Sequence, residues 1–291
     1  MGRGQFLLVA FTLLMVWGSA FTMTDVAVRS LAPAWVVAGR IALATIMVLF
    51  YAYAKGHRLP ALTDERWLWY AALGTIGMAL PFFLISEGQE QIESGLSSIL
   101  VGAMPLMTII LAHFFTDERM TWIRLIGFLI GFGGLIILFF PEDFSLALVS
   151  DWKAQTLVLA AALCYAIATI AAKRAPETPT MVGASMMLIC GTIVSCIGAL
   201  IIGIPQTPPE PIAYLMILGL AIGSTGLGTI LYLYMIDMRG PTVMATINYF
   251  IPVTSVFLGV WFLGEDITPQ IIIAFITIIA GVIVSRIKLK P

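Results

Sequence analysis

Charged side chains are scarce in this sequence, since they make up only 11% of its 291 residues. Apolar residues make up 60%, and the mean hydropathy is +1.02. A water-soluble domain of this size needs much less apolar surface. The composition therefore excludes an ordinary soluble domain and indicates a chain solvated partly by lipid, so a lipid bilayer is its first expected partner.

Features that mark other classes of protein are also missing. The sequence has no run of Lys and Arg, which is the electrostatic surface that nucleic acid needs, and its net charge is −1. Its three cysteines, Cys164, Cys190 and Cys196, lie inside apolar segments without metal-ligand spacing. We interpret them as small core residues. We therefore expect no nucleic-acid partner, no metal site and no cofactor.

Motifs of catalysis are missing as well. The sequence contains no P-loop, no zinc-binding HExxH motif and no histidine–carboxylate cluster in its apolar segments. This disfavours the alternative of a membrane-embedded enzyme, and we predict no catalytic residues. No carboxylate lies near the middle of an apolar segment, so a proton relay through Asp or Glu has no obvious carrier.

Apolar segments of roughly 20 residues, the length that crosses a bilayer as a helix, dominate what is present. Ten segments qualify: 5–28, 33–54, 67–88, 95–116, 121–140, 154–173, 181–203, 212–236, 242–263 and 269–286. They predict an all-α polytopic membrane protein with ten transmembrane helices, numbered here as spans 1 to 10. Span 1 has an alternative interpretation as a cleaved signal peptide, because Arg3 precedes an apolar run that reaches Gly18-Ser19-Ala20. The run continues past Ala20, which favours a retained helix.

Lysine and arginine are distributed unevenly between the loops. If the N-terminus is cytoplasmic, the loops and span ends on that side hold 12 of these residues, whereas the outer loops hold 2, Arg29 and Lys153. Basic loops remain in the cytoplasm during insertion. We therefore predict that both termini are cytoplasmic.

An internal repeat relates the two halves of the chain. When the sequence is shifted by 147 residues, residues 73–137 pair with 220–284 without a gap, so that Pro105 meets Pro252 and Gly134 meets Gly281. Each half holds five spans, an odd number, so the second copy enters the membrane the opposite way up. The prediction is two inverted five-helix repeats, residues 1–143 and 151–291, joined by a linker over 144–150.

Helix breakers occur at corresponding positions of the two repeats. Pro105 corresponds to Pro252, and Pro81 corresponds to Gly228. A proline within a helix removes one hydrogen bond and frees the carbonyl four residues earlier, which in a membrane needs another partner or a wet cavity. A packing kink is the alternative for any single proline. Because the breakers are paired, we predict these four residues as hinge or gating positions.

Polar and aromatic side chains near these breaks are the predicted lining of a substrate cavity. Arg40 is a charge about seven residues into span 2 and is predicted to attract an anionic group, with an ion pair or an extension to the outer interface as the alternative. For the remaining residues the alternative is ordinary helix packing. The other predicted substrate-binding residues are Trp17, Met78, Phe82, Ser98, Tyr165, Thr225, Thr229, Tyr232, Asn248 and Tyr249.

A resemblance to a known family rests on a pattern that occurs once in each half. The pattern consists of Pro105, Asp117-Glu118-Arg119, Gly127 and Gly134, then Pro252, Gly264-Glu265-Asp266 and Gly281, with Trp17-Gly18-Ser19 and Arg40. With this pattern the chain resembles the EamA-like branch of the drug/metabolite transporter superfamily, and it is similar overall to YddG-type amino acid exporters. The resemblance implies a bacterial inner (cytoplasmic) membrane, a central cavity built from spans 1–4 and 6–9, and peripheral spans 5 and 10.

The two halves differ where the cavity is expected. Span 7 has no arginine that matches Arg40, and Cys164-Tyr165 stands in span 6 where span 1 has Trp17-Gly18. We therefore expect a symmetric scaffold around a chemically asymmetric cavity.

The functional hypothesis is a secondary transporter that exports amino acids or related small amphipathic metabolites by alternating access. Either facilitated diffusion or proton coupling is compatible with the sequence. The alternatives are a drug/cation or nucleotide-sugar-type carrier, and a channel-like pore or membrane scaffold. The sequence leaves the oligomeric state open, and a monomer is sufficient because one chain holds both repeats.

Overall fold

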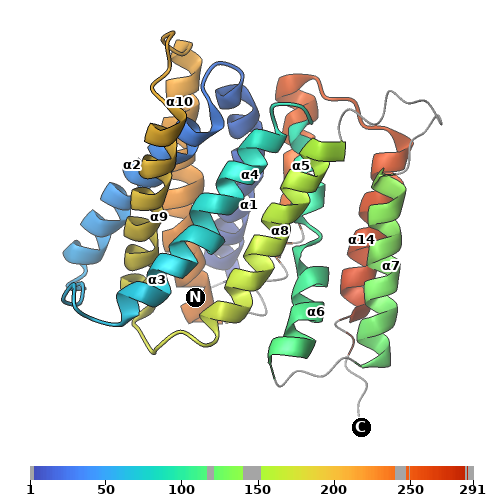
Figure 1. Ribbon diagram of the computed structural model, residues 1–291. Coiled ribbons are helices and arrows are strands. Elements are labelled where there is room, and N and C mark those ends of the chain that lie inside the picture. The colour runs from blue at the N-terminus through green and yellow to red at the C-terminus, as the bar shows by residue number, and fades with distance from the viewer. Residues whose placement is uncertain are drawn as a thin grey trace.

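The computed structural model describes residues 3–116, 121–139, 152–239, 247–248, 250–285 and 287. Over these ranges the chain is helical, with no β-strand (Figure 1). The helices stand side by side as a bundle, and most of the loops lie at its two ends. The proline and glycine clusters between the apolar runs account for these loops, since neither residue continues a helix well.

The first half of the chain contains helices that follow the predicted spans closely. Spans 3 and 4 are each interrupted, the former by a π-helical segment, η1. The elements are α1 (Arg3–Val28), α2 (Pro33–Ala54), α3 (Arg66–Gly74), η1 (Thr75–Ala79), α4 (Leu80–Gly88), α5 (Ser94–Val101), α6 (Met104–Phe115) and α7 (Trp122–Phe139).

The second half repeats this arrangement. Span 8 contains a π-helical segment, η3, and span 9 ends in another, η4. The elements are α8 (Trp152–Ala172), α9 (Thr180–Ile202), α10 (Pro211–Gly219), η3 (Leu220–Leu227), α11 (Gly228–Arg239), α13 (Ile251–Leu258), η4 (Gly259–Leu263) and α14 (Pro269–Ser285). Part of span 9, the linker over 144–150 and Tyr249 lie outside the described residues.

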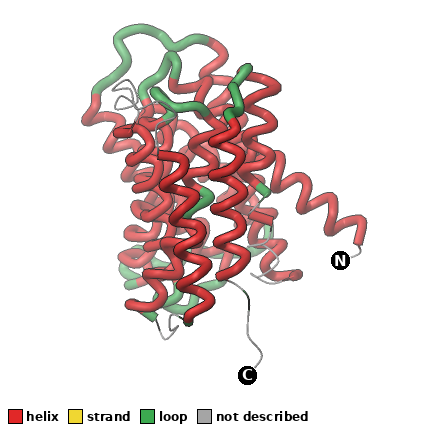
Figure 2. The backbone as a smooth tube through the Cα atoms, turned by 90° about the vertical axis from the view of Figure 1, so that its right-hand side faces the viewer, coloured by secondary structure: helices red, strands yellow, loops and turns green. Residues whose placement is uncertain are grey.

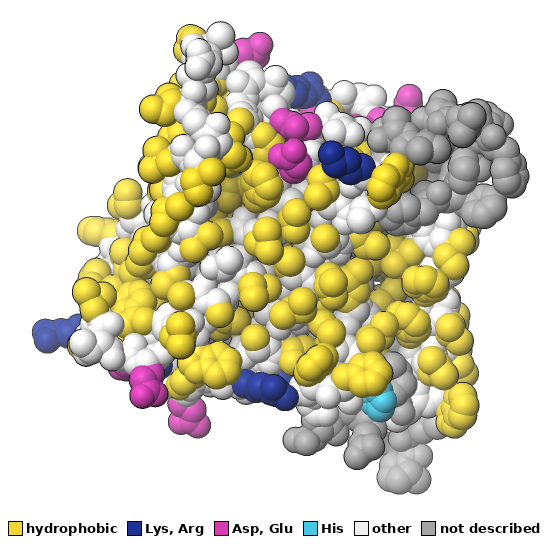
Figure 3. Space-filling model, in the orientation of Figure 1, with side chains coloured by type: hydrophobic (Ala, Val, Ile, Leu, Met, Phe, Trp, Pro, Cys, Tyr) yellow, Lys and Arg dark blue, Asp and Glu magenta, His cyan; other side chains and the backbone are white. Residues whose placement is uncertain are grey.

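The surface of the bundle is apolar, as a lipid-facing surface must be. Trp122, Ile201 and Trp261 are 81%, 80% and 73% exposed. On the face shown in Figure 3, apolar side chains cover the middle and most charged side chains lie toward the two ends. Soluble monomers do not expose apolar patches of this extent.

Length and composition support a membrane protein that crosses the bilayer several times. Within the described residues, 7 helical stretches are long and apolar enough to span. Shorter apolar helices cover Trp122–Ile137, Ile251–Leu263 and Pro269–Ser285, within predicted spans 5, 9 and 10. The chain is therefore a polytopic membrane protein, while ten transmembrane helices and cytoplasmic termini remain predictions.

The outermost helix pair shows reciprocal contacts. Gly131 of α7 lies against Gly281 of α14, and Gly134 lies against Ile278. A shift of 147 residues exchanges these two contacts. A Cβ at Gly127, Gly134 or Gly281 would clash with the facing helix, so glycine permits the close, antiparallel packing.

A second pair of equivalent positions meets inside the bundle. The hydroxyls of Thr45 in α2 and Thr192 in α9 are 2.8 Å apart, and the two residues are 147 positions apart in the chain. Both hydroxyls also bond to the carbonyl of Leu188. When equivalent positions contact each other, they lie near the local axis that relates the copies.

The two ends of helix α1 differ in how closely they pack against the bundle. Figure 2 shows its N-terminal part leaning away from the other helices, and there Leu7, Leu8 and Phe11 are 56%, 65% and 61% exposed. Farther along, Gly18 packs against Thr254 and Ser255 of α13, where no larger side chain would fit. The second half of α1 therefore lies in the centre of the protein, where it can contribute to a site.

Candidate functional site

A buried arginine forms the centre of the candidate site. Arg40 in α2 is only 6% exposed. Its Nε and Nη2 atoms each donate to the Thr225 hydroxyl over 3.2 Å, and Nη2 also donates to the Ser224 hydroxyl over 3.2 Å. Both hydroxyls lie in η3, whose π-helical geometry is frequent at functional sites.

The charge of Arg40 is not neutralised by the rest of the described chain. No carboxylate there forms an ion pair with it, and its Nη1 atom makes no hydrogen bond within the same residues. Phe82 of α4 stacks on the guanidinium, with the ring centroid 3.9 Å from Cζ. Tyr165 of α8 is close enough to interact with it electrostatically. A buried cation without an anion is costly unless a ligand supplies the negative charge.

Trp17 borders the same site from α1. Its indole nitrogen donates to the Ser224 carbonyl over 2.9 Å, and its ring lies 5.7 Å from that of Tyr232. Gly228 lies directly beneath the indole, because a Cβ there would come within 2.5 Å of the Trp17 Nε1 atom. The sequence-predicted residues Trp17, Arg40, Phe82, Tyr165, Thr225, Tyr232 and Gly228 thus lie around one site.

Other predicted lining residues make no hydrogen bond or ring contact with this site within the described residues. Met78 is 9% exposed and packs in a core cluster with Val37 and Ile41, and Phe82 packs against the same cluster. The Ser98 hydroxyl donates to the carbonyl of Gly95 in its own helix. Thr229 is half-buried, Asn248 is exposed, and Tyr249 lies outside the described residues.

The predicted breakers each stand next to an irregular part of a helix. Pro81 is the second residue of α4, which follows η1 directly, and Gly228 begins α11 directly after η3. Pro105 and Pro252 lie in the first turn of α6 and α13. The interruption of span 4 therefore falls at residues 102–103, before Pro105, because a proline at the start of a helix needs no backbone N–H.

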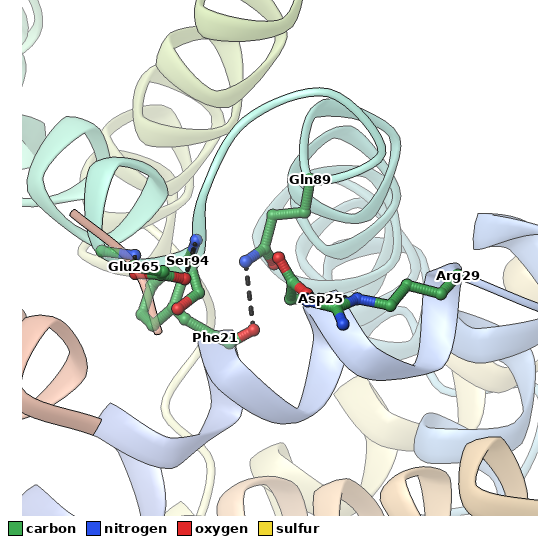
Figure 4. Close-up of polar contacts among 7 residues, drawn as sticks. Phe21, Asp25, Arg29, Gln89, Ser94 and Glu265 are labelled. Atoms are coloured by element: carbon green, nitrogen blue, oxygen red, sulfur yellow. Dashed lines mark hydrogen bonds and ion pairs between the residues drawn. The ribbon is translucent and has the colours of Figure 1, made fainter. Parts of the chain in front are cut away.

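A second polar contact, at the end of the bundle predicted to face outward, joins the two halves of the chain. The Glu265 carboxylate accepts hydrogen bonds from the backbone nitrogens of Ser94 and Gly95, over 2.8 and 2.9 Å (Figure 4). These nitrogens begin α5, so the anion also lies at the positive end of the helix dipole. Nearby, burial raises the pKa of Glu93, and the charges of Glu265, Asp266 and Asp25 add to the effect.

Sequence reasoning did not select Ser224 or the role of Glu265. Ser224 bonds through both its hydroxyl and its carbonyl, and its place in a polar stretch of span 8 was the available signal. Ser94, one of the partners of Glu265, is 171 residues away from it in the sequence. No local pattern reports so distant a contact.

These features define a class of protein. An apolar helical bundle, corresponding irregular helices in its two halves and a buried cationic site are the features of a membrane transporter. The model of the EamA-like transporter family matches the chain twice, over residues 5–140 and 152–287. The chain belongs to this family.

Relatives across the family are similar at low identity over most of the chain. The chain is 26% identical to the "Uncharacterized inner membrane transporter YedA" of Escherichia coli K12, covering 89% of this chain and 83% of the relative. It is 24% identical to a "Probable terminal-alkyne amino-acid exporter" of Streptantibioticus cattleyicolor, with coverages of 92% and 89%. It is 22% identical to the "Uncharacterized transporter YoaV" of Bacillus subtilis, covering 93% of each.

A solved crystal structure has the same fold. It superposes with a TM-score of 0.68 at 18% sequence identity and covers 96% of each chain. Together with the family, it supports the arrangement of helices described above.

Proposed function

We propose that this protein is a secondary transporter that exports amino acids or related small amphipathic metabolites across the bacterial inner membrane. The substrate enters a central cavity between two inverted five-helix repeats, which alternate between inward and outward access. Membership of the transporter family and the name of the Streptantibioticus relative, an amino-acid exporter, support the proposal. The inner-membrane location is supported by the name of the Escherichia coli relative.

The single observation that carries the proposal is the uncompensated charge of Arg40. The side chain is buried, two hydroxyls and the Phe82 ring hold it in place, and no carboxylate of the described residues pairs with it. The carboxylate of an amino acid supplies the missing anion and can accept two hydrogen bonds from a guanidinium. The same positive charge disfavours a cationic drug as the substrate.

Reciprocal packing supports alternating access. The exchange of contacts between α7 and α14, and the meeting of Thr45 with Thr192, are what a two-fold axis between inverted repeats produces. Such a scaffold has two equivalent conformations, because each repeat can adopt the arrangement of the other. The π-helical segments beside Pro81 and Gly228 provide bending points on both sides of the cavity.

The proposal is tested with purified protein in liposomes. Counterflow of labelled neutral amino acids is measured with competition by the same amino acids and by their decarboxylated amines. Arg40→Gln is expected to raise the half-saturating concentration of the amino acid about 10- to 100-fold, since a hydrogen bond to a charged group contributes about 1.5–3 kcal/mol. It should weaken binding of the amine far less.

Two further variants complete the test. Arg40→Lys keeps the charge and is expected to recover part of the affinity, whereas Arg58→Gln removes an exposed arginine from a loop and should leave the flux unchanged. The proposal is wrong if wild-type protein moves no amino acid. The role of Arg40 is wrong if its replacement weakens amine and amino acid equally.

A further inference from the structure

A buried carboxylate at the end of α1 predicted to face outward is not part of the Arg40 site. Asp25 is 8% exposed. Its Oδ1 atom accepts hydrogen bonds from Nε and Nη2 of Arg29, over 2.9 and 2.6 Å. Arg29 itself is 61% exposed, so this partner is solvated and can leave. The second oxygen, Oδ2, has no hydrogen-bond partner within the described residues.

Polar atoms without partners gather on the helices next to Asp25. Thr22, one turn earlier on α1, is 8% exposed, and its hydroxyl has no partner in the described part of the chain. Gln89, which follows α4, is 4% exposed, and its Nε2 atom donates to the Phe21 carbonyl over 3.0 Å. This bond holds the Gln89 amide one turn from Asp25, and the Gln89 Oε1 atom has no partner among the residues that the structure describes. In Figure 4 the Gln89 amide and the Asp25 carboxylate extend toward one another.

The unpartnered Gln89 Oε1 atom indicates that this place needs a hydrogen-bond donor. A buried acceptor without a donor is destabilising because it has lost its hydrogen bonds to water. Two facing acceptors, a carboxylate and an amide oxygen, are satisfied together when one of them carries a proton. Among the described residues no three His, Cys, Asp or Glu side chains are grouped as metal ligands, so a divalent metal ion is disfavoured.

The surrounding charges also favour a bound cation. The charged groups that interact with Asp25 are Arg29 on its own helix, Glu93, and Glu265, whose carboxylate is fixed at the start of α5. Asp266 interacts with Glu93 as well and increases the negative charge of this end of the protein. Arg29 is the one positive group acting on Asp25 among the described residues, and its side chain is largely exposed to solvent.

We propose that Asp25 is the proton-binding site through which this transporter uses a proton gradient. A proton from the outer solution binds to Oδ2, the neutral carboxyl group donates it to the Gln89 Oε1 atom, and Arg29 is released to solvent. The proton leaves to the cytoplasmic solution when the inward-facing transporter re-forms the pair of Asp25 with Arg29, so one proton crosses the membrane in each cycle. The inference rests on the proposed transport function for its coupling step, but proton binding itself can be measured without any substrate.

Proton binding is tested by chemical modification of the full-length protein in liposomes. Dicyclohexylcarbodiimide reacts with protonated carboxyl groups that are shielded from water, and mass spectrometry locates the product. Labelling of Asp25 is expected to fall at least fivefold between pH 5.5 and pH 8.5 and to be absent in Asp25→Asn. Glu90→Gln, which alters an exposed carboxylate of the neighbouring loop, should not change it. Labelling that is absent at every pH, or constant across this range, overturns the proposal.

Coupling is tested in the same liposomes by flux with and without a pH gradient. An imposed gradient should drive uphill movement of the substrate in wild-type protein and in Glu90→Gln. In Asp25→Asn the gradient-driven flux is expected to fall at least tenfold, while counterflow at equal pH remains measurable. Gradient-driven flux that survives in Asp25→Asn overturns the inference, as does a requirement for sodium at constant pH. Absence of any flux in the wild type instead contradicts the proposed function, and the labelling result still decides proton binding.

Discussion

At the scale of single residues, the Arg40 site consists of common side chains that are unusual only because they are polar and lie within apolar helices. Arg40, Thr225 and Trp17 were predicted from the sequence because polar and aromatic groups within apolar spans are conspicuous. Their mutual contacts were not predictable, since Arg40 and Thr225 are separated by 185 residues. Asp25 was overlooked because it lies toward the end of its helix, where a carboxylate next to an arginine looks solvated.

Gly228 provides a test of the close packing in this site. In Gly228→Ala the new Cβ would lie 2.5 Å from the Trp17 Nε1 atom, which cannot move without losing its bond to Ser224. We expect a loss of about 1–3 kcal/mol in unfolding free energy and a marked fall in flux, measured by thermal unfolding in detergent and by counterflow.

The matched control is Gly133→Ala, where a Cβ meets no atom within 4 Å. It should be neutral or slightly stabilising, because alanine favours helix more than glycine. Adding Trp17→Ala should relieve the effect of Gly228→Ala. Equal losses in the two glycine variants would contradict the described contact between Trp17 and Gly228.

At the scale of elements, the irregular helices are more informative than the regular ones. The breakers Pro81, Gly228, Pro105 and Pro252 indicated where the helices depart from α geometry. They did not indicate that two of the departures are π-helical, η1 and η3, because the i→i+5 pattern depends on which carbonyls neighbouring helices leave free. The start of α5 is likewise completed by Glu265 from the other half of the chain.

Glu265 is expected to stabilise α5 through its two short hydrogen bonds. Glu265→Gln keeps the shape but removes the charge and turns an NH₂ group toward one of the backbone donors. We expect a loss of about 0.5–2 kcal/mol, seen as a lower melting temperature in detergent. Asp266→Asn, an exposed neighbour, is the control and should change little. Similar shifts in both variants would mean that general charge, rather than the cap, is responsible.

At the scale of the whole molecule, the composition and the internal repeat indicate a polytopic membrane protein, whereas helix packing brings the residues of the Arg40 site together. The predicted topology places the loop over 57–65 in the cytoplasm and the loop over 203–210 outside. Figure 1 shows the start of α3 and the start of α10 at opposite ends of the bundle. The separation of these two loops by the thickness of the bundle fits the prediction.

Single cysteines test this topology directly. Gln206→Cys is expected to react with a membrane-impermeant maleimide in intact cells, whereas Leu62→Cys, at an 86% exposed position, should react only after permeabilisation. The parent protein is the control, since Cys164, Cys190 and Cys196 lie within helices α8 and α9. The opposite labelling pattern would reverse the predicted orientation, and labelling of both cysteines in intact cells would refute a bilayer between them.

The sequence by itself determined the membrane class, the helical segments and the 147-residue repeat. Hydrophobic length and loop composition are local properties, so they can be read without knowing any long-range contact. Only the tertiary structure decided that Arg40 meets Ser224 and Thr225, and that Gln89 is held one turn from Asp25 on α1. Apolar helices pack through small differences in side-chain shape, and no local pattern records which of many similar faces will meet.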